Sequence, residues 1–131
     1  MNRMTTAIKQ RPKYLNLLKI RQPIPAVVSI LHRISGVGLF LLGIPLALYI
    51  LQSSLSSEAG FDQLKRCLSY PLIKLICFGL IWAFFHHLLA GIRFLLLDIH
   101  AGISLAGTRT SSKIVIVVSL LLTLFVFIKI W

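Results

Sequence analysis

The segment ISGVGLFLLGIPLALYIL, residues 34–51, contains no charged side chain in 18 consecutive positions. An α-helix rises 1.5 Å per residue, so about 20 apolar residues cross the roughly 30 Å of hydrocarbon in a bilayer. Two more uncharged runs follow, at residues 75–92 and 114–128. Together these runs predict three transmembrane helices.

We expect the helices at about residues 26–51, 71–97 and 113–131. The predicted fold class is an all-α membrane protein, in which three helices run alternately up and down in a bundle behind a basic N-terminal segment. The chain has 131 residues, and three such helices leave no room for a separate soluble domain. Residues 1–131 are therefore expected to form a single membrane domain.

The composition supports this class. Hydrophobic residues make up 57% of the chain and charged residues 13%, against about 45–50% and 25% in a typical soluble domain. A soluble enzyme and a disordered chain are both disfavoured. The 14 Lys and Arg against 3 Asp and Glu give a net charge of +11, which in a soluble protein would suggest nucleic acid. Beside apolar helices it indicates the lipid bilayer instead, and no nucleic-acid partner is predicted.

The basic residues also predict an orientation. Six lie within the first 21 positions, where there is no acid. The connection at 98–112 contains Arg109 and has a basic residue just before and just after it, whereas the connection at 52–70 balances two basic against two acidic residues. Because basic residues concentrate on the cytoplasmic side of membrane proteins, we expect the N-terminus and the 98–112 connection to be cytoplasmic.

Three polar segments remain. Residues 1–25 contain three prolines. They form either a basic strap, which lies on the membrane surface or against a partner protein, or a solvated tail that is attracted to anionic lipid. The 52–70 segment has apolar residues at helical spacing and predicts a short surface helix that ends near Pro71. The 98–112 segment is rich in Gly, Ser and Thr and predicts a flexible connection.

Ionisable residues inside a membrane span are costly and are candidates for function. Ser29, His32 and Arg33 are spaced i, i+3, i+4, so a helix places them on one face near its cytoplasmic end. A hydroxyl, an imidazole and a guanidinium there suit a ligand with oxygens at the interface and an apolar body below, such as a quinone or the propionates of a heme. The alternative is that His32 and Arg33 reach lipid headgroups.

A second group, His86 and His87, lies near the bilayer midplane. An imidazole there needs a polar partner, and a metal ion or a neighbouring helix can provide one. Ala83 and Gly91 lie one turn either side of His87 and leave space for a flat macrocycle, which Phe84 and Phe94 could line. Arg93 lies toward the cytoplasmic side, where heme propionates would point.

A six-coordinate heme needs two axial ligands. His86 and His87 are adjacent and point about 100° apart on a helix, so both cannot bind one iron from opposite sides. His32 lies too close to the membrane surface. A heme would therefore take its second ligand from another polypeptide.

These residues resemble a known family. The strings RPKYLNLLKIRQPIPAVVSILHRISG at 11–36, SLSSEAGF at 54–61 and HLLAGIRFLLLD at 87–98 are similar to the cytochrome b556 subunits of succinate dehydrogenase, the larger membrane anchors of respiratory complex II. The resemblance covers nearly the whole chain. It implies a complex with a flavoprotein subunit, an iron–sulfur subunit and a smaller hydrophobic membrane anchor subunit.

The resemblance also implies residue roles. Ser29 and Arg33 match residues that help form the ubiquinone site, and His32 matches a residue near the propionates of heme b. His87 matches the axial ligand of the heme iron, whose opposite ligand is a histidine of the smaller anchor. The chain departs from the family pattern in two places.

Phe94 stands where the family often has histidine, which puts one propionate hydrogen bond in doubt. His86 stands where an aromatic residue is common and is the fallback ligand. The expected cellular location is a bacterial inner membrane, and the alternative is the mitochondrial inner membrane with the N-terminus in the matrix. Two other functions remain open: a heme-less structural anchor of a similar complex, of the fumarate reductase type, or a small transporter component.

Overall fold

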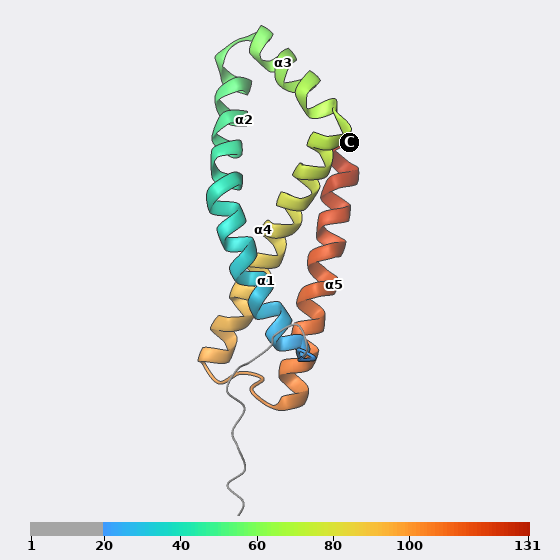
Figure 1. Cartoon of the computed structure of the whole chain (residues 1–131). Coiled ribbons are helices and arrows are strands. Elements are labelled where there is room, and N and C mark those ends of the chain that lie inside the picture. Colours follow the sequence, from blue (N-terminus) through green and yellow to red (C-terminus); the bar gives the residue numbers. More distant parts are fainter. Residues whose placement is uncertain (1–19) are drawn as a thin grey trace, which may run out of the picture.

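A computed structural model describes residues 20–131, and every element in that range is a helix (Figure 1). The elements are α1 (Ile24–Gly38), the π-helical η1 (Leu39–Gly43), α2 (Ile44–Ser56), α3 (Glu58–Ser69), α4 (Pro71–Asp98) and α5 (Leu105–Ile130). Three helical spans are long and apolar enough to cross a membrane: Ile24–Ser56, Pro71–Asp98 and Leu105–Ile130. The prediction of an all-α protein with three membrane-spanning helices is confirmed. The strap or tail at the N-terminus lies mostly outside the described residues.

The first span continues to Ser56, five residues past the predicted end, and contains a π-helical turn. Pro45 has no N–H to donate to the carbonyl four residues earlier, and its ring crowds that carbonyl. Just before it, the backbone N–H of Ile44 donates to the carbonyl of Leu39, five residues earlier. This wide turn changes the course of the helix. As a result α1 packs against α4 and α5, whereas α2 contacts α3 and η1 within the described range.

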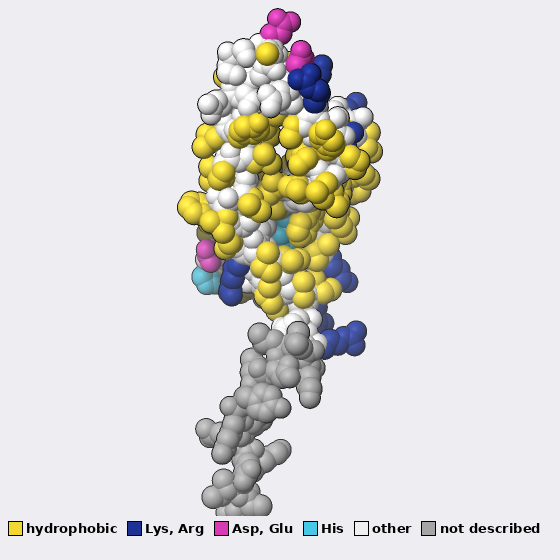
Figure 2. Space-filling model, turned by 45° about the horizontal axis from the view of Figure 1, so that its top comes forward, with side chains coloured by type: hydrophobic (Ala, Val, Ile, Leu, Met, Phe, Trp, Pro, Cys, Tyr) yellow, Lys and Arg dark blue, Asp and Glu magenta, His cyan; other side chains and the backbone are white. Residues whose placement is uncertain are grey.

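The membrane bundle is held together by small and hydroxyl-bearing residues. The fully buried contact between α1, α4 and α5 is formed by Val28, Ala90 and Val115. On α5, three buried hydroxyl residues, Ser112, Ser119 and Thr123, donate to carbonyls of their own helix. Such residues allow helices to approach closely in lipid. Large apolar side chains face outward instead, and Figure 2 shows them as a broad yellow band with Lys and Arg at its two ends.

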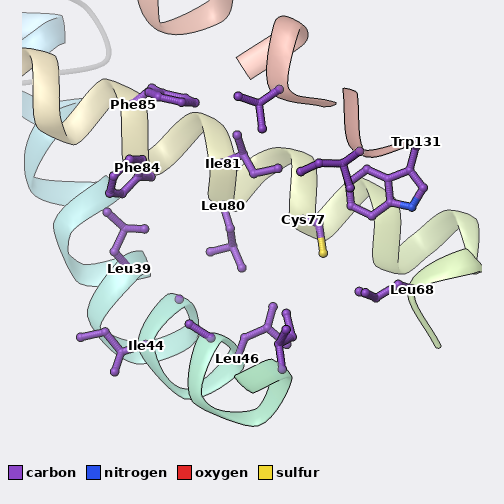
Figure 3. A pocket seen from close by; sticks show the side chains of 15 residues that line it. Leu39, Ile44, Leu46, Leu68, Cys77, Leu80, Ile81, Phe84, Phe85 and Trp131 are labelled. Atoms are coloured by element: carbon purple, nitrogen blue, oxygen red, sulfur yellow. The ribbon is translucent and has the colours of Figure 1, made fainter. Parts of the chain in front are cut away.

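The connection at the far end of the bundle is the predicted surface helix, α3. Ser57 caps it, because its side chain accepts a hydrogen bond from the Gly60 N–H at 3.1 Å. Below α3, an apolar cavity of about 700 Å³ separates α2 from α4 and the end of α5 (Figure 3). Leu39, Leu80, Phe84 and Trp131 are among its lining residues, and within the described range no charged side chain lines it. Cys67 and Cys77 are both free.

The connection between α4 and α5 is shorter than the sequence suggested. The third helix begins at Leu105 rather than near residue 113, because Ser104 caps it by accepting from the Gly107 N–H at 3.0 Å. A Cβ on Gly107 would lie 2.7 Å from the carbonyl oxygen of Gly102. The Gly, Ser and Thr content that predicted a flexible connection therefore builds a tight turn and a capped helix start.

Candidate functional site

Two histidines meet where α1 crosses α4. The His32 and His87 rings stack with centroids 4.1 Å apart and planes inclined by 8°. Both side chains are half-buried. Phe94 contacts the His32 ring edge-on at 5.2 Å between centroids. Spacing along the sequence did not predict this pair, since it depends on how the two helices cross.

Hydrogen bonds determine which nitrogen of His87 carries the proton. His87 Nδ1 lies 3.0 Å from the backbone carbonyl oxygen of His32. A carbonyl oxygen only accepts, so Nδ1 must donate. Ser35 Oγ donates to the same carbonyl at 2.9 Å. In the neutral ring, Nε2 is then left with a free lone pair.

Each histidine of the pair packs on a glycine of the opposite helix. The spacing H-x-x-x-G occurs in both helices, as His32 and Gly36 in α1 and as His87 and Gly91 in α4. A Cβ on Gly36 would lie 2.8 Å from Cε1 of His87, and a Cβ on Gly91 would lie 3.6 Å from Nε2 of His32. Gly36 therefore makes room for the His87 ring, and Gly91 lies against His32 within this chain.

The other predicted residues of the first group lie on the same helix. Ser29 is half-buried and Arg33 is exposed, and both lie on α1. Neither side chain hydrogen-bonds to another residue within positions 20–131. Their polar groups are available to a ligand or to headgroups at the end of the bundle from which α1 starts (Figure 1).

His86 has a different environment from His87. Its side chain is fully buried inside the bundle, and its ring stacks on Trp82 with 5.1 Å between centroids. Among residues 20–131, neither ring nitrogen has a hydrogen-bond partner of good geometry, although a backbone group of Val28 lies near the ring, and the Trp82 indole nitrogen also lacks a partner. His86 therefore does not present a nitrogen to a ligand outside the chain.

Arg93 reaches α5, and its guanidinium also lies over the Phe94 ring, 5.3 Å from the centroid. Arg93 Nε donates to Ser111 Oγ at 3.0 Å, and one of its terminal nitrogens donates to the Thr108 carbonyl at 3.3 Å. Both partners belong to α5. Phe84 is exposed and lines the apolar cavity of Figure 3. The propionate contact of Arg93 and the heme contact of Phe84 stay predictions.

The residues present fit a heme iron at His87. A histidine that binds a metal usually donates its second ring N–H to a carbonyl or a carboxylate, which fixes the ring. His87 makes that bond, and Gly36 leaves the space that its ring needs. No group of three or more His, Cys, Asp or Glu side chains that could hold a metal ion occurs among residues 20–131.

The fold and this site define a three-helix membrane protein with paired histidines on facing helices. Residues 7–126 match the model of the succinate dehydrogenase/fumarate reductase transmembrane subunit family. The chain is also similar to proteins named succinate dehydrogenase cytochrome b556 subunit. The Coxiella burnetii protein is 37% identical over 93% of this chain and 98% of its own. The Paracoccus denitrificans protein is 35% identical over 89% and 92%.

A third such protein, from Rickettsia typhi, is 33% identical over 94% of this chain and 99% of its own length. The chain therefore belongs to the family of transmembrane subunits of succinate dehydrogenase and fumarate reductase. The resemblance found in the sequence is confirmed at this level.

Proposed function

We propose that this chain anchors a succinate dehydrogenase to the membrane, binds heme b through His87, and contributes Ser29 and Arg33 to the site that reduces ubiquinone. The observation that carries the proposal is the hydrogen bond from His87 Nδ1 to the His32 carbonyl at 3.0 Å. It supports Nε2 as the ligating atom, because that nitrogen keeps its lone pair. The bound iron would accept and return single electrons.

The choice of His87 over His86 rests on burial. His86 is enclosed by the chain's own helices, so a ligand shared with another subunit cannot reach it. His87 is half-buried where α1 and α4 pack together. His32 is in direct contact with it and would lie near the propionates.

The second axial ligand is expected from the smaller hydrophobic anchor subunit. His32 and His87 stack ring face to ring face, so these two side chains would not hold one heme iron together. The heme would therefore bridge two polypeptides.

Ser29 and Arg33 have chemistry suited to a quinone. The Ser29 hydroxyl can donate a hydrogen bond to a quinone carbonyl. Arg33 can stabilise the negative charge that develops on that oxygen during reduction. Electrons would come from succinate oxidation on the flavoprotein subunit, by way of the iron–sulfur subunit, and the quinone would gain two electrons and two protons.

The location we propose is a bacterial inner membrane with a cytoplasmic N-terminus. The basic residues near the start of α1 and near the α4–α5 connection support that orientation. Soluble subunits would dock at this end, beside Ser29 and Arg33.

A reduced-minus-oxidised visible spectrum of the purified complex tests the heme proposal. We expect a b-type absorption band in the wild-type complex, loss of that band in His87→Ala, and its retention in the matched control His86→Leu. A band of normal size in His87→Ala would overturn the ligand assignment. Absence of the band from a wild-type complex that contains all subunits would leave only the anchor function.

A further inference from the structure

The side chain of Arg93 is buried without a counter-ion. Only 5% of it is exposed, although it lies within the second membrane span. Its two hydrogen-bond acceptors, Ser111 Oγ and the Thr108 carbonyl, are both neutral. The sequence has only three acids, Glu58, Asp62 and Asp98, and none of them pairs with Arg93 in the structure. A charge in this position is costly unless an anion accompanies it.

The guanidinium has unused donors. It carries five N–H groups in a planar fork that fits a carboxylate or a phosphate. Two hydrogen bonds to α5 hold it in place. The remaining N–H groups can bind an anion without disturbing the α4–α5 contact.

Arg93 lines a cavity of about 440 Å³ between α4 and α5. That volume lies within the usual range of ligand pockets, about 300–1,000 Å³. Apart from Arg93 and Ser111, most of its wall is aliphatic, with Ile92, Leu96 and Val118 among the lining residues. Ala101 and Gly102 place one end of it at the α4–α5 connection. By contrast, no charged side chain lines the larger cavity of Figure 3.

This cavity is separate from the histidine pair. Leu96 follows His87 by nine residues, and at 3.6 residues per turn that places the two on opposite faces of α4. Ile92 and Leu96 are both exposed. The cavity therefore opens away from His87, on the face that α4 shares with α5.

We propose that this cavity binds an anionic phospholipid of the leaflet at the α4–α5 connection, with its phosphate on Arg93 and Ser111 and an acyl chain along Ile92, Leu96 and Val118. The unpaired positive charge selects an anion. The apolar wall selects a ligand with a hydrocarbon tail rather than free phosphate. The position of Arg93, five residues before the end of α4, matches the depth of a headgroup rather than the bilayer centre.

The test uses the complete purified complex in nanodiscs of phosphatidylglycerol or of phosphatidylcholine, with bound lipids counted by native mass spectrometry. We expect the wild type to retain phosphatidylglycerol and not phosphatidylcholine. Arg93→Gln should lower this retention about tenfold, a loss of about 1.4 kcal/mol. Val118→Phe, which fills the cavity and keeps the charge, should lower it similarly. Lys113→Gln, which removes an exposed cation of α5 outside the cavity, should have no effect.

Several results would overturn the proposal. If Val118→Phe retained as much phosphatidylglycerol as the wild type, the proposal would be wrong, even if Arg93→Gln failed to assemble. Displacement of the lipid by inorganic phosphate would show a simple anion site. If the Arg93→Gln complex lost another subunit while Val118→Phe retained its lipid, the counter-ion of Arg93 would be a carboxylate of that subunit.

Discussion

The ring of His32 lies flat on the ring of His87, and the backbone carbonyl of His32 accepts the Nδ1 proton of the same His87. One residue of α1 therefore holds the proposed ligand in two ways, through its ring and through its backbone. The glycines one turn further on complete the arrangement, because Gly36 leaves room for the His87 ring and Gly91 lies against His32. The position of His87 thus depends on close approach of α1 and α4.

We predict that Gly36→Ala displaces His87. The added Cβ would lie 2.8 Å from His87 Cε1, which is closer than side-chain atoms pack, and overpacking of this kind costs about 1–3 kcal/mol. Heme content per complex should fall, and the thermal unfolding midpoint should decrease. Absorption spectroscopy and a thermal melt of the purified complex measure the two effects.

Gly38→Ala is the matched control for this change. Gly38 lies two residues further along α1, and a Cβ there would have no neighbour within 4 Å. Alanine is also the better helix former, by about 1 kcal/mol. Heme content should stay at the wild-type level. An equal loss in both variants would mean that α1 tolerates no added methyl group, and that the His87 contact is not the cause.

We predict that His86→Leu leaves stability unchanged or raises it. His86 is fully buried and both of its ring nitrogens lack partners, a condition that costs about 1–3 kcal/mol for each unsatisfied group. Leucine removes those polar atoms at the cost of a modest change in shape. A thermal melt of the complex measures the difference. A lower midpoint would mean that His86 has a partner in the assembled complex.

The sequence predicts the spans well, because an uncharged run of 18 residues has few other stable environments. It predicts α3 from the spacing of Phe61, Leu64 and Leu68. It predicts the start of α5 poorly. Ser and Thr are common both in loops and at helix starts, so their presence does not show where the loop ends. The hydrogen bond to Ser104 in the structure marks that point as the helix start.

The candidate site was predictable in its residues but not in its contacts. His32 and His87 are recognisable as polar groups in apolar helices. Their stacking depends on the crossing of α1 and α4, which no local pattern encodes. The H-x-x-x-G spacing that both helices share was a usable indication that α1 and α4 lie close together, since small residues allow helices to approach. The hydrogen bonds of Arg93 to α5 were not predictable from the sequence either, because they depend on how α4 and α5 pack.

We predict that Ser104→Ala destabilises the start of α5. Ser104 accepts the Gly107 N–H at 3.0 Å, and the loss of such a cap costs about 1 kcal/mol. Hydrogen exchange at residues 105–108 should accelerate several-fold. Ser54→Ala is the control, because Ser54 is a half-buried serine whose hydroxyl bonds only to a carbonyl of its own helix in the structure. Equal exchange rates at 105–108 in Ser104→Ala and the wild type would show that Ser104 does not cap the helix.

We predict that Ser29→Ala and Arg33→Leu slow electron transfer to ubiquinone without affecting succinate oxidation. Both residues lie on α1 at the end of the bundle proposed to face the soluble subunits, away from any site at which succinate would react. Loss of one charge-assisted hydrogen bond, about 1.5–3 kcal/mol, corresponds to a decrease of about ten- to a hundredfold in the quinone reductase rate for Arg33→Leu, and to a smaller one for Ser29→Ala.

The measurement compares two acceptors in one preparation of the complex. Succinate-dependent reduction of ubiquinone should fall, and succinate-dependent reduction of a water-soluble dye, which takes electrons before they reach the membrane, should not. Lys113→Gln, an exposed cation on α5, should leave both rates at the wild-type level. If the two rates fell together in Arg33→Leu, Arg33 would be needed for docking of the soluble subunits rather than for quinone reduction, since detachment removes both reactions from the membrane fraction. If neither rate changed in either variant, Ser29 and Arg33 would have no part in the quinone site.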